Sequence, residues 1–334
     1  MWSNDMILSV SRRTDIPAFY AEWFMNRLKA GFVYVRNPFN TYQVSEVPLT
    51  PDNVDAIVFW TKNSKPLHQY LSEIDNMGYK YYFQFTITPY GKDMEENIEK
   101  KEKIVETFKT LSEKTGKEKV ILRYDPIILN NKYTIDFHIK SFERLCSILS
   151  SYTKKVVISF LDDYKKISKN IKEHNIKEIT VDEMNIIAEN FSNITKQYND
   201  LTLESCAEEI NLENYNINHG KCIDDELIGK ITNSILDVSK DNQRTACGCV
   251  KCIDIGEYNT CLHKCLYCYA NIDKESAFEN FKRHDKYSPL LIGNIDRIKD
   301  KITKRNQKDT KSLKKVDKVI AKQPSVEDML NLEK

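Results

Sequence analysis

Short apolar runs alternate with longer amphipathic stretches along most of the chain. The short runs are rich in β-branched and aromatic residues, as buried strands are, and the longer stretches repeat apolar residues at helical spacing. This alternation is typical of a parallel sheet that is wrapped by helices. The predicted strands are residues 6–11, 55–60, 81–88, 119–124, 156–161 and 201–205.

The stretches between these strands carry helix signals. Residues 18–31 and 65–78 each end on a glycine, as helices commonly do, and residues 136–152 form a third predicted helix. Residues 32–49 predict an inserted hairpin. The sequence holds no long repeat, low-complexity tract or Pro/Gly-rich linker.

We therefore expect one α/β domain over residues 1–296, built as a complete or partial TIM-like parallel barrel. Its cysteine-rich segment, residues 247–271, forms part of that domain. Residues 297–334 are dense in lysine and nearly free of large apolar residues, which predicts a basic C-terminal helix or tail.

Charge and hydropathy narrow the choice of partners. Fifty Lys and Arg residues face 49 Asp and Glu residues, so the net charge of +1 calls for neither nucleic acid nor an anionic membrane. No apolar run approaches the roughly 20 residues of a membrane helix, and the N-terminus lacks the pattern of an export signal. We expect a cytoplasmic protein.

Polar residues close nearly every predicted strand, which is where barrel chemistry gathers. We expect them to line a pocket for a small-molecule or anionic substrate, with Arg123, Asp125 and Lys62 as catalytic candidates. The alternative is that they pair with one another or cap the next helix, as Asp15 could. The set is Arg12, Arg13, Asp15, Thr61, Lys62, Asn63, Gln84, Thr86, Thr88, Arg123, Asp125, Asp162, Glu204, Cys206 and Glu208.

Nine cysteines without an export signal point to metal binding or catalysis, because a reducing cytosol keeps thiols free. Cys146 lies in an apolar helical pattern and is predicted to be a buried structural thiol. Cys261, Cys265 and Cys268 instead share one short loop. Structural zinc normally takes four protein ligands, so three thiols in one loop favour a four-iron cluster with one iron open to another molecule.

The spacing C-x3-C-x-aromatic-C, formed by Cys261, Cys265, Tyr267 and Cys268, resembles the cluster loop of radical S-adenosylmethionine enzymes. In that superfamily the open iron chelates the amino and carboxylate groups of S-adenosylmethionine. An electron from the reduced cluster then cleaves the sulfonium to give a deoxyadenosyl radical. The resemblance implies a 4Fe-4S cluster and S-adenosylmethionine as cofactors, Tyr267 as the shield of cluster and adenine, and an electron donor such as flavodoxin or ferredoxin.

Residues 7–20 together with 247–271 also resemble the family called domain of unknown function 1848, a likeness that covers nearly the whole chain and names no substrate. In radical enzymes the cluster loop usually follows the first strand, whereas here it comes near the end. A circular permutation would explain this order. It predicts that residues 250–258 form a strand parallel to and beside residues 7–11, and that residues 275–284 begin the following helix.

The permuted order places "SVSRRTDIP" where the superfamily binds its cofactor. Arg12, Arg13 and Asp15 are therefore predicted to bind the carboxylate, amine or ribose of S-adenosylmethionine. The glycine-rich and acidic motif that usually stands there is not visible in this sequence.

Four further thiols, Cys206, Cys222, Cys247 and Cys249, are predicted to share a second metal centre of iron-sulfur or zinc type, with Cys252 as a bystander. The alternative is that some of these are ordinary small core residues. The leading hypothesis for the whole chain is a radical S-adenosylmethionine enzyme. The alternative is a structural zinc protein whose barrel binds a ligand or RNA. A third possibility, an electron carrier, does not explain the polar ring of strand ends.

Overall fold

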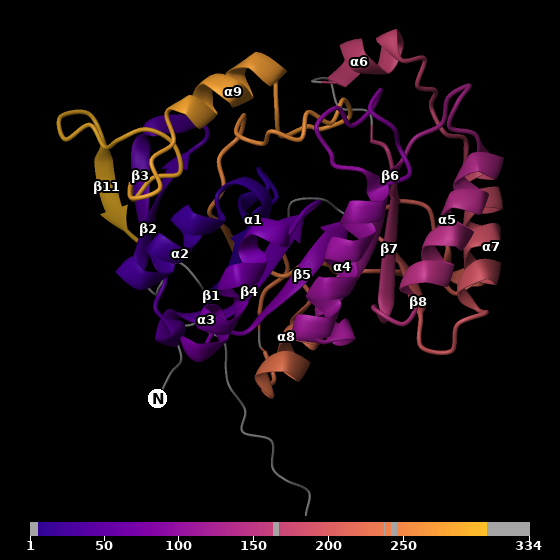
Figure 1. The fold of residues 1–334 in the computed structure, drawn as a ribbon, viewed down its shortest axis with the longest axis horizontal. Coiled ribbons are helices and arrows are strands. Elements are labelled where there is room, and N and C mark those ends of the chain that lie inside the picture. The colour runs from indigo at the N-terminus through magenta and orange to yellow at the C-terminus, as the bar shows by residue number, and fades with distance from the viewer. Residues whose placement is uncertain (1–5, 163–166, 237, 242–245, 306–334) are drawn as a thin grey trace, which may run out of the picture.

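A computed structural model describes residues 6–162, 167–236, 238–241 and 246–305 of the chain. Its centre is an eight-stranded parallel sheet in the order β10-β1-β4-β5-β6-β7-β8-β9 (Figure 1). All six strands predicted from the sequence are confirmed. The strands are β1 Met6–Val10, β4 Val54–Thr61, β5 Tyr81–Thr86, β6 Val120–Ile127, β7 Lys155–Phe160, β8 Thr202–Ser205, β9 Asn218–His219 and β10 Ile253–Asp254.

The sheet is open, so the closed form of the expected barrel is not confirmed, while the parallel α/β class is. Within the described residues, β10 and β9 are the two edges of the sheet and do not pair with each other. Each is only two residues long. Such short strands offer too little backbone hydrogen bonding to close a barrel.

Strand β10 lies parallel to β1, with Leu8 opposite Ile253 and Ser9 opposite Asp254. The prediction that the strand before the cysteine loop lies beside residues 7–11 is therefore confirmed. The chain forms β1 first, and more than two hundred residues later it forms β10, which lies next to β1 at the edge of the sheet. The first strand and the strand before the cysteine loop therefore meet at one edge.

Most of the helices cover one face of this sheet. The predicted helix 18–31 is interrupted at Tyr20 and ends, as expected, at Gly31, which has a left-handed φ of 76°. The predicted helix 65–78 begins as a 3-10 turn over Lys65–Tyr70. The helices are α1 Ile16–Phe19, α2 Ala21–Ala30, α3 Leu71–Asn76, α4 Lys101–Thr115, α5 Ile135–Leu149, α6 Ser168–Glu173, α7 Val181–Thr195, α8 Asp225–Thr232 and α9 Lys274–Lys282.

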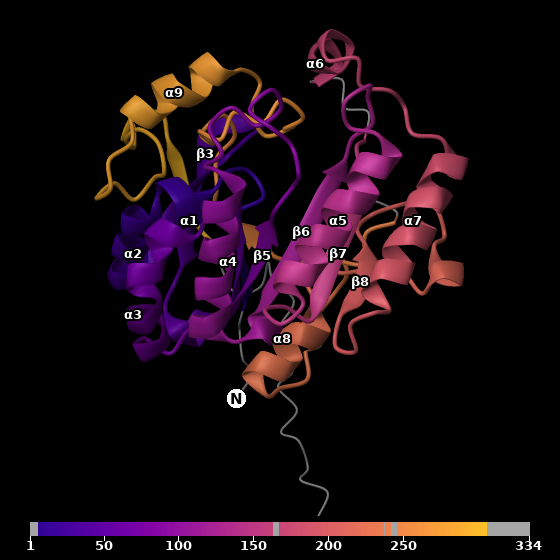
Figure 2. The same ribbon diagram turned by 45° about the vertical axis from the view of Figure 1, so that its right-hand side comes forward.

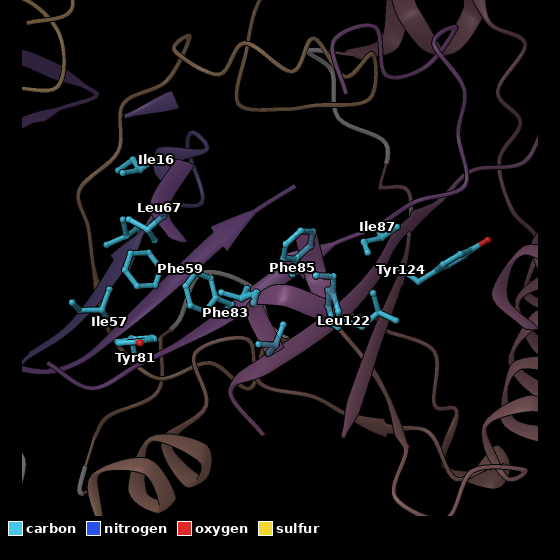
Figure 3. Packing of buried hydrophobic residues seen from close by; sticks show 14 of the residues in the cluster. Ile16, Ile57, Phe59, Leu67, Tyr81, Phe83, Phe85, Ile87, Leu122 and Tyr124 are labelled. Atoms are coloured by element: carbon cyan, nitrogen blue, oxygen red, sulfur yellow. The ribbon is translucent and has the colours of Figure 1, made fainter. Parts of the chain in front are cut away.

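The main core lies between the sheet and these helices, and we call this side of the sheet the helix face. Figure 3 shows its aromatic centre. The rings of Phe59 and Phe83 stack with centroids 4.8 Å apart, and Phe85 meets Phe108 of α4 edge to face at 5.2 Å. Alternate residues of a strand point to opposite faces, so the neighbours of these aromatics point to the other side.

That other side, which we call the cavity face, carries a second and smaller apolar cluster. Val58 and Tyr82 pack there against Cys222, Cys249 and other residues of the segment that leads to and from α8. Figure 2 shows α8 at the end of the sheet opposite to α6 and α9. The cysteine-rich segment therefore fills the space that the inside of a closed barrel would provide.

The predicted hairpin is confirmed as β2 Phe32–Asn37 and β3 Asn40–Pro48, which pair antiparallel. Strand β11, Lys301–Lys304, adds a third strand parallel to β3. Strand β11 falls within the segment expected to be a helix or tail. It is only four residues long, all of them exposed, so its sequence carries no strand pattern. Residues 306–334 of the same segment lie outside the described residues. In the part of the chain that is described, no helix is long and apolar enough to span a membrane.

Candidate functional site

A cavity of about 450 Å³ opens at the carboxyl ends of the parallel strands. The loops after β1, β4, β7 and β8, the end of β5 and the second half of β6 all contribute to it, because parallel strands direct their carboxyl ends to one edge of the sheet. All the residues predicted to be catalytic, cofactor-binding or metal-binding line this cavity. Five members of the predicted polar set, Asn63, Gln84, Thr88, Glu204 and Glu208, are not among the described residues of its lining. The predicted site residues that line it are Arg12, Arg13, Asp15, Lys62, Arg123, Asp125, Cys206, Cys222, Cys247, Cys249, Cys261, Cys265, Tyr267 and Cys268.

The loop with Cys261, Cys265 and Cys268 lies on the segment that follows β5. Cys265 forms an antiparallel bridge with Glu95, and the Leu266 N–H donates to the Met94 carbonyl at 3.0 Å. Two further bonds run from Asn97 to this loop, to the carbonyls of residues 262 and 263. This pairing holds the cysteine loop at the cavity rim.

The three thiols of the loop are partly exposed, and they face the cavity rather than bulk solvent. Burial raises the pKa of all three thiols above the ordinary value. The Cys268 sulfur accepts the Ala270 N–H at 3.4 Å. A cation bound among these sulfurs would offset the cost of ionising them.

Among the described residues, no three or more His, Cys, Asp or Glu side chains are arranged to hold a metal ion. The sulfurs around a single zinc ion lie about 3.7 Å apart, given bonds of about 2.3 Å. The thiolates of a four-iron cluster bind separate irons and lie farther apart. A metal at either cysteine group stays a prediction.

Asp15 joins three parts of the site. It caps α1 by accepting the Ala18 N–H at 2.9 Å, so the helix-capping alternative is confirmed for this residue. Its Oδ2 also accepts the Lys62 N–H at 2.7 Å and the Thr61 hydroxyl at 3.1 Å. The same oxygen lies 2.7 Å from Nε2 of His263. Asp15 thus connects the ends of β1 and β4 to the cysteine loop.

Sequence reasoning missed His263, which lies inside the cysteine loop and is only 4% exposed. Because a carboxylate only accepts, Nε2 donates the hydrogen bond to Asp15. The other ring nitrogen, Nδ1, is buried and has no hydrogen-bond partner among the described residues. The ring packs against Phe19, with centroids 4.6 Å apart. The signal available in the sequence was a histidine between two of the loop cysteines.

Glu95 is a second residue that the sequence did not single out. Its carboxylate, 1% exposed, accepts from Lys62 at 2.8 Å, from Thr88 at 2.6 Å, and from Lys101 and the Tyr267 hydroxyl. Burial raises the pKa of Glu95, but Lys62 and Lys101 outweigh it and bring the pKa to about 2. Burial likewise lowers the pKa of Lys62, and Glu95 more than compensates. Glu95 was inconspicuous because it stands among many surface acids.

Tyr267 belongs to the cysteine loop, and its hydroxyl donates to Glu95. Its ring meets Tyr90 edge to face at 5.8 Å, and the Lys62 ammonium lies 5.6 Å from the ring centroid. The predicted shielding aromatic therefore contacts two other residues of the site. What it shields stays a prediction.

Arg123 and Asp125 form a largely buried ion pair in the lining of the cavity. The Arg123 Nε donates to both carboxylate oxygens, at 3.0 and 3.1 Å. Its Nη1 donates to the Cys222 sulfur at 2.9 Å and to Gln84 at 3.2 Å. The guanidinium also lies 5.4 Å from the ring centroid of Trp60. Two of the predicted catalytic residues are thus joined to the second group of cysteines.

Arg12 and Arg13 are organised by Asp254 of β10, which sequence reasoning also missed. Asp254 accepts the Arg12 N–H at 2.7 Å and lies 3.9 Å from the Arg13 Nε. The Arg12 guanidinium donates to the sulfur of Cys252 at 3.2 Å, and Arg13 lies over the Tyr258 ring at 5.3 Å. Cys252 itself is absent from the residues that line the cavity within the described chain, and its role as a bystander stays a prediction.

The second group of cysteines comes together from three separate segments. The sulfurs of Cys206 and Cys222 lie 2.9 Å apart. The Cys249 sulfur accepts the N–H groups of Cys222 and Ile223 at 3.3 and 3.4 Å. A hydrogen bond from the Cys249 thiol lowers the pKa of Cys247 to about 7. The four thiols therefore form a continuous chain of contacts in the order 206, 222, 249, 247.

The family described as a domain of unknown function, DUF1848, matches residues 7–270. No curated protein and no solved structure matches the chain. The matched region begins in β1 and ends directly after the cysteine loop, so it includes the whole parallel sheet and every candidate residue of the cavity. The chain belongs to the DUF1848 family.

Proposed function

We propose that this protein is an iron-sulfur enzyme that reductively cleaves S-adenosylmethionine and starts radical chemistry on a small-molecule substrate. The observation that carries the proposal is the position of Cys261, Cys265 and Cys268. They lie on one loop at the carboxyl edge of a parallel sheet, and all three face one cavity. The strand before this loop lies beside β1, as expected for a circularly permuted radical enzyme.

The residues present fit a 4Fe-4S cluster. Three soft sulfur donors suit iron-sulfur chemistry, and neither aspartate nor histidine would replace them equally well. Hydrogen bonds from backbone N–H groups to the ligand sulfurs, such as the bond from Ala270 to Cys268, are among the features that set the potential of such clusters. A cavity of about 450 Å³ falls within the range of small-molecule and cofactor sites.

Cys261, Cys265 and Cys268 would hold the cluster, and Arg12, Arg13 and Asp15 would lie on the cofactor side of the cavity. Once bound, the reduced cluster supplies the electron that cleaves the sulfonium of S-adenosylmethionine. The protein supplies position and exclusion of water. Glu95 fixes the loop through Tyr267 and Lys62, and Asp15 fixes it through His263.

The substrate side of the cavity is formed by the Arg123–Asp125 ion pair and Lys62. Arg123 and Lys62 offer positive charge and Asp125 offers a hydrogen-bond acceptor. We expect an anionic or polyhydroxylated substrate, held by these groups during radical transfer. An electron donor such as flavodoxin or ferredoxin would reduce the cluster in a cytoplasmic setting.

The second candidate function is a structural zinc protein whose α/β domain binds a ligand or RNA. It is favoured by the contact of four thiols on the cavity face, a ligand set that also suits zinc. Colour separates the two candidates, because a protein with an iron-sulfur cluster purified without oxygen is brown and a zinc protein is colourless. Iron and acid-labile sulfide analysis of the same sample quantifies the difference.

The decisive experiment is anaerobic incubation of the protein with S-adenosylmethionine and a strong reductant, followed by chromatography for deoxyadenosine. We expect product from the parent protein and only background from Cys265→Ala. The matched control is Cys146→Ala, which removes a buried thiol in α5 behind the helix face and should leave the yield unchanged. Absence of product from a parent shown to carry its full cluster would overturn the proposal.

A further inference from the structure

We propose that Cys206, Cys222, Cys247 and Cys249 form a separate site for a single soft divalent cation, of which zinc is the natural example. The four residues come from the loop after β8, from the segment before α8 and from the segment before β10. Sixteen residues separate Cys206 from Cys222 and 25 separate Cys222 from Cys247. Their meeting is therefore a product of the fold. This inference does not depend on S-adenosylmethionine chemistry.

The distance between the Cys206 and Cys222 sulfurs favours a single ion over a cluster of several metals. The Cys206 and Cys222 sulfurs, 2.9 Å apart, are closer than the separation of about 3.7 Å found around tetrahedral zinc. These two sulfurs could bind one cation together after a small outward movement. A cluster of several irons would require a much larger displacement of segments that pack tightly against Val58 and Tyr82.

The four thiols form a chain of contacts, in which Cys206 and Cys247 are the two ends, and a bound cation would draw these ends together. All four residues line the cavity, but Cys206 and Cys247 are partly exposed whereas Cys222 and Cys249 are buried. The two more exposed ligands are thus the ones that a cation entering from the cavity meets first. The buried half is already fixed by the surrounding backbone.

Three hydrogen-bond donors reach these sulfurs and would stabilise thiolates bound to a cation. Two backbone N–H groups, of Cys222 and Ile223, donate to Cys249, and the Arg123 guanidinium donates to Cys222. Four thiolates with one divalent cation carry a net charge of −2, which Arg123 partly balances. Gln84 and the Tyr82 hydroxyl both donate to the Cys222 carbonyl, at 2.9 and 2.7 Å, and so orient this residue.

The ligand chemistry selects the metal. Four sulfur donors in a tetrahedral shell suit zinc and its spectroscopic substitute cobalt, and they disfavour magnesium or calcium, which prefer oxygen. The Asp125 carboxylate, which reaches this environment through Arg123, has both of its oxygens accepting from that guanidinium. The proposed site is therefore a pure thiolate site with a cationic neighbour.

The test uses cobalt(II) and a full-length variant that lacks the other cysteine group, C261S/C265S/C268S, prepared without metal and fully reduced. Binding by four thiolates produces an intense sulfur-to-cobalt absorption in the near ultraviolet together with the visible bands of tetrahedral cobalt. We expect both signals to saturate at one cation per chain and to disappear on addition of zinc. Further substitution Cys206→Ser or Cys222→Ser should weaken cobalt binding by at least about 100-fold.

Further variants show whether the loss of cobalt binding is specific to the proposed ligands. Cys252→Ser and Cys146→Ser, in the same background, should bind cobalt with unchanged affinity, and Arg123→Gln should weaken binding by about 10-fold. Circular dichroism of each variant shows that it is folded. The inference is overturned if folded C261S/C265S/C268S shows no thiolate-to-cobalt absorption, or if Cys206→Ser leaves that absorption intact. The cobalt experiment does not measure deoxyadenosine formation. Neither result therefore decides the proposed function, which the anaerobic assay tests separately.

Discussion

The two faces of the same strands show how this protein separates stability from chemistry. On β5, Tyr81, Phe83 and Phe85 point to the helix face and belong to the main core. Tyr82 and Gln84, one residue along, point to the cavity face and hydrogen-bond the backbone of Cys222. The alternation of a strand therefore assigns packing to one parity of residues and site chemistry to the other.

Strand β6 repeats the same division. Leu122 and Tyr124 belong to the apolar core on the helix face, whereas Arg123 and Asp125 line the cavity. A shift of one residue would place the Arg123 guanidinium in the aromatic core and expose two apolar side chains to the cavity. Burial of an unpaired charge is so costly that the register of β6 is strongly determined.

The largest expected effect comes from a substitution that removes a core side chain on the helix face. Phe83→Ala removes a ring that stacks on Phe59, and we expect it to lower the free energy of unfolding by about 4 kcal/mol. On the same strand, Thr86→Ala changes a side chain that faces the cavity and should cost less than about 1 kcal/mol. Urea denaturation measures both. Equal losses for the two variants would show that the faces do not differ in this way.

The next test concerns the cavity side, where stability depends on buried charge. Glu95→Gln leaves the ammonium groups of Lys62 and Lys101 without their carboxylate, and we expect a loss of about 3 kcal/mol in the free energy of unfolding. Glu99→Gln is the matched control, because Glu99 lies on the exposed part of the same segment and should change stability by at most about 0.5 kcal/mol. A loss of similar size in both variants would contradict the central position of Glu95.

The smallest expected effect is a pH dependence that comes from the helix face. His138 is fully buried, and burial lowers its pKa from 6.5 to about 4. Since the unfolded chain binds a proton at this residue below pH 6.5 and the folded chain does not, stability falls as the pH falls through this window. We expect a loss of about 2 kcal/mol between pH 6.5 and 5.

The variant His138→Gln should remove this part of the pH dependence while keeping a donor for the Ile128 carbonyl, which His138 contacts at 2.9 Å. Urea denaturation of both proteins at pH 7, 6 and 5 measures the two slopes. If the free energy of unfolding changes with pH by the same slope in both proteins, groups other than His138 cause the loss of stability at low pH.

The strands, the hairpin and the candidate residues of the cavity could be predicted because each has a local signature. A buried strand is an apolar run, and a ring of polar strand ends follows from the strands themselves. Glu95, His263 and Asp254 could not be found in this way. Each owes its importance to partners from distant segments, as when Glu95 accepts from Tyr267 across more than 170 residues of chain. A lone acid in a polar loop carries no such information.

The sequence by itself determined the six main strands of the sheet, which face of each of them is apolar, and that three thiols share one loop, because these properties depend on neighbours within a few positions. Tertiary structure decided that the sheet stays open, since the two-residue edges β9 and β10 cannot pair over a useful length. It also decided that Cys206, Cys222, Cys247 and Cys249 meet on the cavity face. Contacts of this kind join segments that are far apart in the chain, and only the packing of the whole sheet brings them within bonding distance.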